Sequence, residues 1–186
     1  MDDNQIVDLY WVRSESAITE SSKKYSRYCR SIAMNILANT EDAEECVNDT
    51  FLKAWNSMPQ NRPALLSSYL GRITRNLALN IYKKRKAEKR GGGEMELILN
   101  ELEDCLSSKS SVEDELEMDQ IGKLISRFLR KLPEESRTVF VRRYWYSDSI
   151  ASIAAQYGMS ESKVKSILFR CRNKLKLFLE SEGVAL

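Results

Sequence analysis

A pair of short helical patterns joined by a glycine, in residues 149–180, constrains this chain more than any other stretch. Apolar residues recur there at i, i+3, i+4 and i+7, as on one face of a helix, and they are Ile150, Ile153, Ala154 and Tyr157. Asp148 is a candidate N-cap of this helix, and Gly158 is placed to end it in a left-handed conformation. Ser160 then caps a second helix. A helix of about nine residues, a glycine turn and a second helix match the helix-turn-helix unit.

The second helix is apolar on one side and cationic on the other. The side expected to be buried carries Val164, Ile167, Leu168, Cys171, Leu175, Phe178 and Leu179. The other side carries six cations within fourteen residues, with an aromatic and a serine among them: Lys163, Lys165, Ser166, Phe169, Arg170, Arg172, Lys174 and Lys176. Cations suit phosphates, and arginine, serine or an aromatic ring can contact base edges in a major groove. We therefore expect this helix to bind DNA; the alternative is an amphipathic hairpin with a solvated basic face.

Charge is segregated along the chain, although the net charge is only +2. Eight cations and one acid lie between Arg72 and Arg90, whereas ten acids and one cation lie between Glu94 and Asp119. The C-terminal helices are basic again. Two basic bodies separated by an acidic connector indicate a polyanion bound at two separate places, so nucleic acid is the leading partner.

Composition argues against several other classes of protein. No run approaches the roughly eighteen apolar residues of a membrane span, and the acidic N-terminus is unlike a secretory signal. Histidine is absent and the cysteines lie far apart, at Cys29, Cys46, Cys105 and Cys171. Neither a zinc-finger site nor any other metal or cofactor is expected, and four buried free thiols in a reducing cytoplasm are the simpler interpretation. No acid–base or nucleophile constellation can be assembled, so we expect no catalytic residue.

Residues 5–38 read as helical, and a further helix follows a cap at Asn39 or Thr40. This helix has an apolar side made of Ala43, Cys46, Val47, Thr50, Phe51, Ala54, Trp55 and Met58. Its opposite stripe is acidic with one leucine, and it comprises Asp42, Glu45, Asp49, Leu52 and Asn56. Carboxylates also line di-metal bundles, but those bundles use Glu-x-x-His, and histidine is absent. The stripe is either a solvated face or a docking surface for a basic helical partner.

Pro59 and Pro63 interrupt the chain before a helix predicted over residues 64–86. Its apolar side carries Leu66, Tyr69, Leu70, Ile73, Leu77 and Ile81. Its other side carries Arg72, Arg75, Asn76, Leu79, Asn80 and Lys83. Asparagine is a poor helix former, so two asparagines one turn apart on a basic face indicate a function. Amides can hydrogen-bond base edges and neighbouring aromatics can stack on unpaired bases; the alternative is two solvated amides.

No segment has the periodicity of a strand, so we predict an all-α chain of two small helical domains. The first domain comprises residues 1–90, and an acidic flexible linker covers residues 91–119. Within the linker we expect one short apolar helix, which carries Met95, Leu97, Ile98, Leu99, Leu102 and Leu106. The second domain comprises residues 120–186. In it, Pro133 begins a helix at its first turn, and the helix-turn-helix comes last.

Four runs occur in a fixed order: DAEECVNDTFLKAW (42–55), YLGRITRNLALN (69–80), LPEESRTVFVRRY (132–144) and VKSILFRCR (164–172). In this order and with these gaps they resemble the extracytoplasmic-function sigma factors of bacterial RNA polymerase, over nearly the whole chain. The resemblance implies a protein that binds polymerase core, recognises the −35 and −10 promoter elements and promotes DNA melting. Residues 1–90 would correspond to sigma region 2, and residues 120–186 to sigma region 4.

The resemblance also implies roles for individual residues. Those that bind the clamp helices of the largest polymerase subunit would be Asp42, Glu45, Asp49, Leu52 and Asn56. Those that contact and open the −10 element, with a flipped non-template base in a pocket, would be Tyr69, Arg72, Arg75, Asn76, Asn80 and Lys83. Those that read the −35 element would be Lys163, Lys165, Ser166, Phe169, Arg170, Arg172 and Lys174. The implied partners are polymerase core, through its clamp helices and flap, double- and single-stranded promoter DNA and, as is common in the family, an anti-sigma factor.

Two other classes of function fit the sequence less well. An autonomous helix-turn-helix repressor or activator would use its N-terminal body to bind an effector or to dimerise. Such a body has no need of the basic, asparagine-bearing helix over residues 72–86. An enzyme would need an acid–base or nucleophilic site, for which the residue types are missing.

Overall fold

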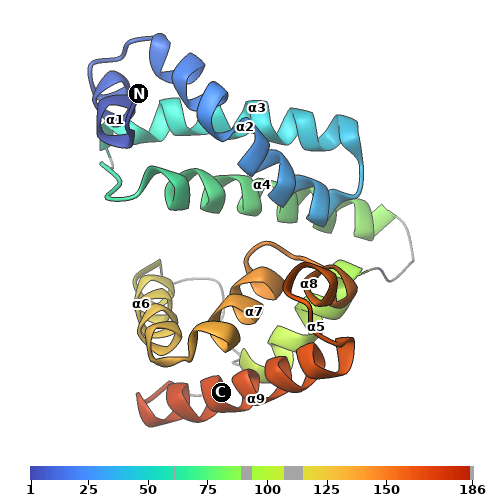
Figure 1. Cartoon of the computed structure of the whole chain (residues 1–186). Coiled ribbons are helices and arrows are strands. Elements are labelled where there is room, and N and C mark those ends of the chain that lie inside the picture. The colour runs from blue at the N-terminus through green and yellow to red at the C-terminus, as the bar shows by residue number, and fades with distance from the viewer. Residues whose placement is uncertain (61, 89–93, 107–114, 185–186) are drawn as a thin grey trace. The chain divides into compact units, whose positions relative to one another are not determined.

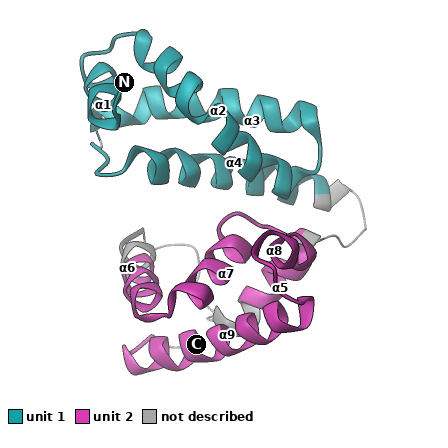
Figure 2. Ribbon diagram, viewed as in Figure 1, with its two compact units in different colours: residues 1–91 teal, residues 92–186 magenta. Residues whose placement is uncertain are grey.

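The structure, a computed structural model, describes residues 1–60, 62–88, 94–106 and 115–184. Regular structure in these residues is entirely helical, in nine α-helices and one short 3-10 helix. The helices form two compact units, Met1–Gly91 and Gly92–Leu186, which Figure 2 draws in separate colours. The predicted all-α chain with two helical bodies is therefore confirmed.

The N-terminal unit consists of α1 (Asp3–Trp11), α2 (Ser16–Leu37), α3 (Thr40–Ser57), the 3-10 helix η1 (Met58–Gln60) and α4 (Leu66–Glu88). Helices α2, α3 and α4 each pack on the other two, and α1 packs on α2 (Figure 1). The core includes Ile6, Val7, Tyr10, Tyr25, Cys29, Val47, Phe51, Ala54, Met58, Leu66, Leu70 and Ile73. Full burial of one large apolar side chain is worth about 1.5–3 kcal/mol, so these apolar faces decide how the helices pack.

Side-chain caps determine where these helices begin. Asp2 and Gln5 form a capping box, in which each side chain accepts the other residue's backbone N–H over 3.0 Å or less. Asn39, one of the two predicted caps of α3, accepts the backbone N–H of Asp42 over 3.0 Å. Ala38 just before it takes a left-handed conformation with φ 51°, which ends α2 and turns the chain into α3.

The C-terminal unit consists of α5 (Glu94–Leu106), α6 (Glu115–Lys131), α7 (Glu134–Tyr144), α8 (Ile150–Tyr157) and α9 (Glu161–Ser181). Helix α9 contacts the other four helices, so the unit is assembled around it. Its predicted inward side is confirmed at Val164, Ile167, Leu168, Cys171, Leu175 and Leu179, which are buried, whereas Phe178 is half-buried. Phe128, Val139, Phe140, Tyr144 and Ile153 from the surrounding helices are also buried.

The C-terminal unit begins earlier than the sequence predicted. Helix α5, expected inside the linker, packs against α9, with Met95 and Ile98 buried. Helix α6 begins at Glu115 rather than near residue 120. An apolar stripe is more stable on a neighbouring core than in water, which explains why α5 joins this unit. Of the linker predicted over residues 91–119, residues 91–93 and 107–114 lie outside the described residues.

Pro133 is the N-cap of α7, with φ −52° and ψ 147°, and therefore lies one residue before the predicted first turn. Among the described helices, none combines the length and the apolar character needed to cross a membrane.

Candidate nucleic-acid interface

Helices α8 and α9 form the predicted helix-turn-helix. Gly158 ends α8 in a left-handed conformation with φ 63°, which a residue with a Cβ adopts only with strain. Ser160 then caps α9, and its hydroxyl accepts the backbone N–H of Lys163 over 3.2 Å. The tight turn and the cap together set the direction in which α9 leaves α8.

The N-cap of α8 is Ser149, and the prediction of Asp148 is wrong. The Ser149 hydroxyl accepts the backbone N–H of Ser152 over 3.1 Å. Asp148 lies one residue earlier and is buried, and its carboxylate is 2.5 Å from Nε of Arg142. Burial of an unpaired carboxylate costs free energy, so Asp148 forms the ion pair with Arg142, and Ser149 caps the helix instead.

Most residues predicted to contact DNA on α9 are exposed, namely Lys163, Lys165, Ser166, Phe169, Arg170 and Lys174. Phe169 lies outside the core with 58% of its surface exposed. Lys163 pairs with Glu135 on the surface, a kind of contact worth about 0–1 kcal/mol, so a phosphate can displace it. Arg170 donates its Nε–H to the carbonyl of Ser166 over 3.2 Å, which holds its guanidinium along the helix.

Arg172 differs from the other cations of α9, because the rest of the unit engages it. Its Nη1 donates to the Tyr144 hydroxyl over 2.8 Å and lies 3.6 Å from Oε2 of Glu101 on α5. Glu101 also accepts a bidentate pair from Arg143, over 3.2 and 2.9 Å, and the Tyr144 hydroxyl donates to it over 2.9 Å. One carboxylate of α5 therefore holds two arginines and a tyrosine of α7 and α9.

This arrangement changes the acidity of Glu101 and Tyr144. Burial by itself raises the pKa of Glu101, but the hydrogen bonds and charges of Arg143, Tyr144 and Arg172 together lower it below its ordinary value. Burial raises the pKa of Tyr144, and the negative charge of Glu101 raises it further. Glu101 is therefore ionised and Tyr144 neutral at physiological pH, the states that the hydrogen bonds require.

On α3, four of the five residues of the predicted acidic stripe are exposed, namely Glu45, Asp49, Leu52 and Asn56. Leu52 has 55% of its surface exposed and lies on the opposite side from the core. Asp42 differs, because it is half-buried and forms an ion pair with Arg85 of α4. The stripe that a partner can reach therefore starts at Glu45.

On α4, the polar face predicted from the sequence is exposed at Arg72, Asn76, Asn80 and Lys83. Tyr69 is half-buried, and its hydroxyl lies 2.7 Å from Oγ of Ser57 on α3. The Arg72 guanidinium lies 5.9 Å from the centre of the Tyr69 ring. Arg75 is half-buried and so is less accessible than its neighbours. The amides and cations thus share one solvent face, beside which Tyr69 is anchored.

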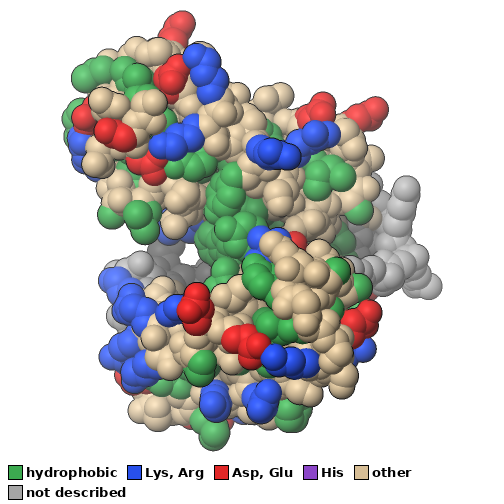
Figure 3. All heavy atoms as spheres, viewed as in Figure 1, with side chains coloured by type: hydrophobic (Ala, Val, Ile, Leu, Met, Phe, Trp, Pro, Cys, Tyr) green, Lys and Arg blue, Asp and Glu red, His purple; other side chains and the backbone are tan. Residues whose placement is uncertain are grey.

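The sequence interpretation assigned no role to the cations in the second half of α6. Its exposed cations are Lys123, Arg127, Arg130 and Lys131. In Figure 3, Lys and Arg side chains gather over α6 and along α9 on the visible face. The ring of Phe178 on α9 lies 5.5 Å from Arg127 and 5.0 Å from Lys131, measured to the ring centre. The signal was present, because residues 121–132 hold four cations and no acid.

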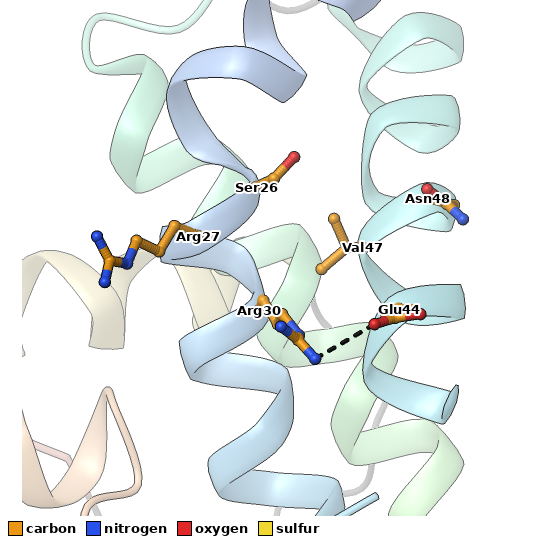
Figure 4. Close-up of a pocket in the computed structure, with 6 residues that line it drawn as sticks. All are labelled: Ser26, Arg27, Arg30, Glu44, Val47 and Asn48. Atoms are coloured by element: carbon orange, nitrogen blue, oxygen red, sulfur yellow. Dashed lines mark ion pairs between the residues drawn. The ribbon is translucent and has the colours of Figure 1, made fainter. Parts of the chain in front are cut away.

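A hollow of about 430 Å³ lies between α2 and α3 in the N-terminal unit, lined by Ser26, Arg27, Arg30, Glu44, Val47 and Asn48 (Figure 4). Arg30 and Glu44 reach across it and pair over 3.2 Å, whereas the Arg27 guanidinium points away. The charges that line the hollow therefore neutralise each other instead of converging on a ligand.

The described residues hold no group of three or more side chains suited to a metal ion. Three of the cysteines, Cys29, Cys46 and Cys171, are free and buried. Burial raises the pKa of the Cys46 thiol to about 12 and raises those of the other two as well. These thiols are therefore protonated core residues. The side chain of Cys105 lies outside the described residues.

Comparison with known proteins matches both units to regions of one class of transcription factor. Residues 22–88 match Sigma-70 region 2, and residues 128–177 match Sigma-70 region 4. The ECF RNA polymerase sigma factor SigL of Mycobacterium tuberculosis is 29% identical over 157 residues, which is 82% of each chain. SigM of Bacillus subtilis, another ECF sigma factor, is 22% identical over 165 residues, or 86% of this chain and 94% of SigM.

A solved structure, that of CnrH in complex with the cytosolic domain of CnrY, is also similar. The match covers 96% of this chain and 97% of the matched chain, with 21% sequence identity and a TM-score of 0.43.

Two helical units, one with an amide-bearing basic helix and the other with a helix-turn-helix, define a bacterial sigma factor with regions 2 and 4. The relatives specify the class further: the chain belongs to the ECF sigma factors. It therefore acts in transcription initiation, by binding polymerase core and promoter DNA, and sigma factors in general are not enzymes. Nothing in the comparisons favours an autonomous regulator.

Proposed function

We propose that three exposed helix faces divide the work of this sigma factor. α3 binds the clamp helices of the largest polymerase subunit, α4 holds the opened −10 element and α9 reads the −35 element, while the C-terminal unit also contacts the flap. The observation that carries this proposal is that each helix exposes a charged or amide face and buries the opposite face in its unit. Such a protein acts in the cytoplasm, where polymerase and promoters are, and needs no catalytic residue.

The face of α3 suits a basic helical surface. Glu45, Asp49 and Leu52 follow one another at spacings of four and three residues, so they form one continuous stripe on the helix. Carboxylates steer and orient a basic partner, while covering Leu52 completely adds about 1.5–3 kcal/mol. An anti-sigma factor that covered this stripe would compete directly with polymerase.

The face of α4 suits single-stranded DNA. Asn76 and Asn80 are exposed one turn apart, and each amide offers both donors and an acceptor to bases that have lost their pairing partners. Arg72 and Lys83 lie on the same helix and can follow the phosphates. Unpairing costs a few kcal/mol per base, and pocket contacts to a flipped base offset that cost.

The face of α9 suits a major groove. Arg170 and Ser166 lie one turn apart with Phe169 beside them, so a forked donor, a hydroxyl and an apolar ring are available to base edges. Lys165 and Lys174 are exposed on the same helix and can pair with phosphates. This combination allows both positioning and base recognition.

Binding to polymerase makes the weak interactions of the two units with DNA sufficient for promoter recognition. Two small modules pay an ordering cost when they bind DNA, so the free protein binds weakly. When the clamp and the flap hold one unit each, the spacing of the modules is set, and each raises the effective concentration of the other at the promoter. Promoter recognition and melting are then coupled to assembly on the enzyme.

The proposal is tested on α3. A variant that combines Glu45→Lys, Asp49→Lys and Leu52→Ala should lose binding to purified polymerase core and run-off transcription that depends on added protein. Its helicity and melting temperature should stay close to those of the wild type, because all three side chains lie off the core.

A matched control carries Asp8→Lys, Glu15→Lys and Leu65→Ala. These residues are also exposed in the N-terminal unit but lie off the stripe, and the change in net charge is the same. The control should bind core normally. Wild-type affinity of the first variant for core would refute the assignment of α3, and equal losses in both variants would indicate a general charge effect.

A further inference from the structure

We infer that Glu101 of α5 withholds Arg172 from DNA in the free protein, so that α5 is a built-in brake on DNA binding by the C-terminal unit. The inference deepens the proposed −35 role of α9 and rests on it. Its basis is the position of Arg172 among the cations of α9 and the contacts that Arg172 makes.

Arg172 belongs to a stripe that is otherwise open to solvent. Lys165, Phe169, Arg172 and Lys176 follow one another at spacings of four, three and four residues, so they lie along one side of α9. Lys165, Phe169 and Lys176 are exposed, whereas the Arg172 side chain is only 19% exposed. The one cation that the stripe does not present to solvent is thus the one beside the carboxylate of α5.

The contacts allow Arg172 to leave without disrupting the rest of the cluster. Glu101 keeps its bidentate pair with Arg143, over 3.2 and 2.9 Å, and the hydrogen bond from Tyr144 over 2.9 Å. Arg143 is fully buried and also donates to the carbonyl of Asp148 over 3.0 Å, so it stays in place. Arg172 also donates to the Tyr144 hydroxyl over 2.8 Å, and that hydroxyl keeps its own hydrogen bond to Glu101 when Arg172 leaves. At 3.6 Å, Arg172 is the outermost cation on Glu101 and the one that a phosphate can take over.

Competition for Arg172 makes α5 and DNA antagonists. A phosphate and Glu101 are both anions, and one guanidinium held by the first interacts less with the second. By linkage, the contact between Arg172 and Glu101 weakens DNA binding by the same free energy by which bound DNA weakens that contact. Removing the charge of Glu101 should therefore strengthen binding through Arg172 and through no other cation.

A double-mutant cycle on the full chain tests this, with a random-sequence DNA duplex as the probe and fluorescence anisotropy as the readout. Glu101→Gln should bind the duplex about fivefold or more tightly at low salt, with a salt dependence steeper by about one charge. Arg172→Ala should weaken duplex binding less in the wild-type background than in the Glu101→Gln background, because Glu101 already occupies the guanidinium in the wild type. Adding Arg172→Ala to Glu101→Gln should cancel the gain.

Two control variants distinguish a failure of the brake from a failure of DNA binding by α9. Glu180→Gln removes one exposed acid from α9 and has the same effect on net charge, so it should not give the gain. Lys174→Ala should weaken duplex binding if the basic face of α9 binds DNA at all. A loss with Lys174→Ala but no gain with Glu101→Gln would overturn the brake alone. If neither variant changed duplex affinity, both the brake and the DNA-binding role of α9 would be overturned.

Hydrogen exchange of the unmodified protein tests the brake even if Glu101→Gln destabilises the unit. Saturating duplex should speed exchange of the backbone amides of α5, because Glu101 loses one of its partners, while exchange of α9 slows. Unchanged or slower exchange in α5, with DNA bound to α9, would overturn the inference.

Discussion

Gly71 lies on α4, directly against the ring of Tyr28 on α2. An added Cβ would lie 3.1 Å from Tyr28 Cζ and closer still to the hydroxyl, inside ordinary contact distance. Gly71→Ala should lower the free energy of unfolding by about 1–2 kcal/mol, because overpacking outweighs the better helix propensity of alanine. Urea denaturation followed by circular dichroism measures this loss.

The variant Tyr28→Phe supplies the control for Gly71. It removes the hydroxyl that the new methyl group meets first, so Gly71→Ala should be less destabilising in the Tyr28→Phe background. The same loss in both backgrounds would show that the hydroxyl is not the obstacle.

Arg170 and Lys174 on α9 are expected to differ in what they recognise. Arg170→Ala should change which −35 bases are tolerated, because a forked guanidinium discriminates guanine by about 1–3 kcal/mol. Lys174→Ala should weaken binding to all sequences similarly and reduce the salt dependence by about one charge. A promoter library with a randomised −35 hexamer, read out with each variant in complex with polymerase, measures both effects. An unchanged base preference with Arg170→Ala would remove that residue from the recognition surface.

At the scale of the element, α4 is expected to act after the duplex opens. Asn76→Ala and Asn80→Ala should lower open-complex formation more than closed-complex binding, because their amides would contact bases exposed only by unpairing. Permanganate footprinting measures the opening. A template already mismatched at the −10 element should restore much of the lost activity. If duplex and mismatched templates show equal losses, the asparagines serve the fold rather than the bases.

Helix α5 is expected to make the C-terminal unit sensitive to acid. The folded-state pKa of Glu101 lies below its ordinary value of 4.5, so its stabilising effect is complete above that value and is lost as pH falls through the lowered pKa. The melting temperature of the wild type should exceed that of Glu101→Gln at pH 7, and the difference should shrink as pH falls below 4.5. Calorimetry of the two proteins across this range measures it. A difference that stays constant with pH would mean that the charge of Glu101 does not stabilise the fold.

At the scale of the whole molecule, the position of α5 defines where the second folding unit begins. A fragment of residues 92–186 should unfold cooperatively, whereas one of residues 120–186 loses the buried Met95 and Ile98 and the carboxylate that Arg143 requires. We expect the shorter fragment to be less stable by about 3 kcal/mol, with a melting temperature lower by about 10–20 °C. Thermal unfolding followed by circular dichroism compares them. Equal melting temperatures would place α5 outside the unit.

Local patterns were sufficient for much of this protein. The spacing of apolar residues predicted the helices and the inward faces of α3, α4 and α9. Turn chemistry predicted the caps at Asn39 and Ser160 and the left-handed Gly158. These features depend on residues within one or two turns of each other, so a single stretch of sequence contains all the information. The family was indicated separately, by the resemblance of four sequence runs in a fixed order to the ECF sigma factors.

Only the tertiary structure determined which partners the individual polar residues contact. Periodicity places Arg172, Asp42 and Tyr69 on helix faces, but Glu101, Arg85 and Ser57 respectively engage them from other helices. The packing of α5 on α9 could not be predicted from the sequence either. A helical pattern indicates to which side of its own helix a side chain points. Which distant side chain it meets depends on how whole helices pack, and that is settled by the summed burial of all their apolar faces.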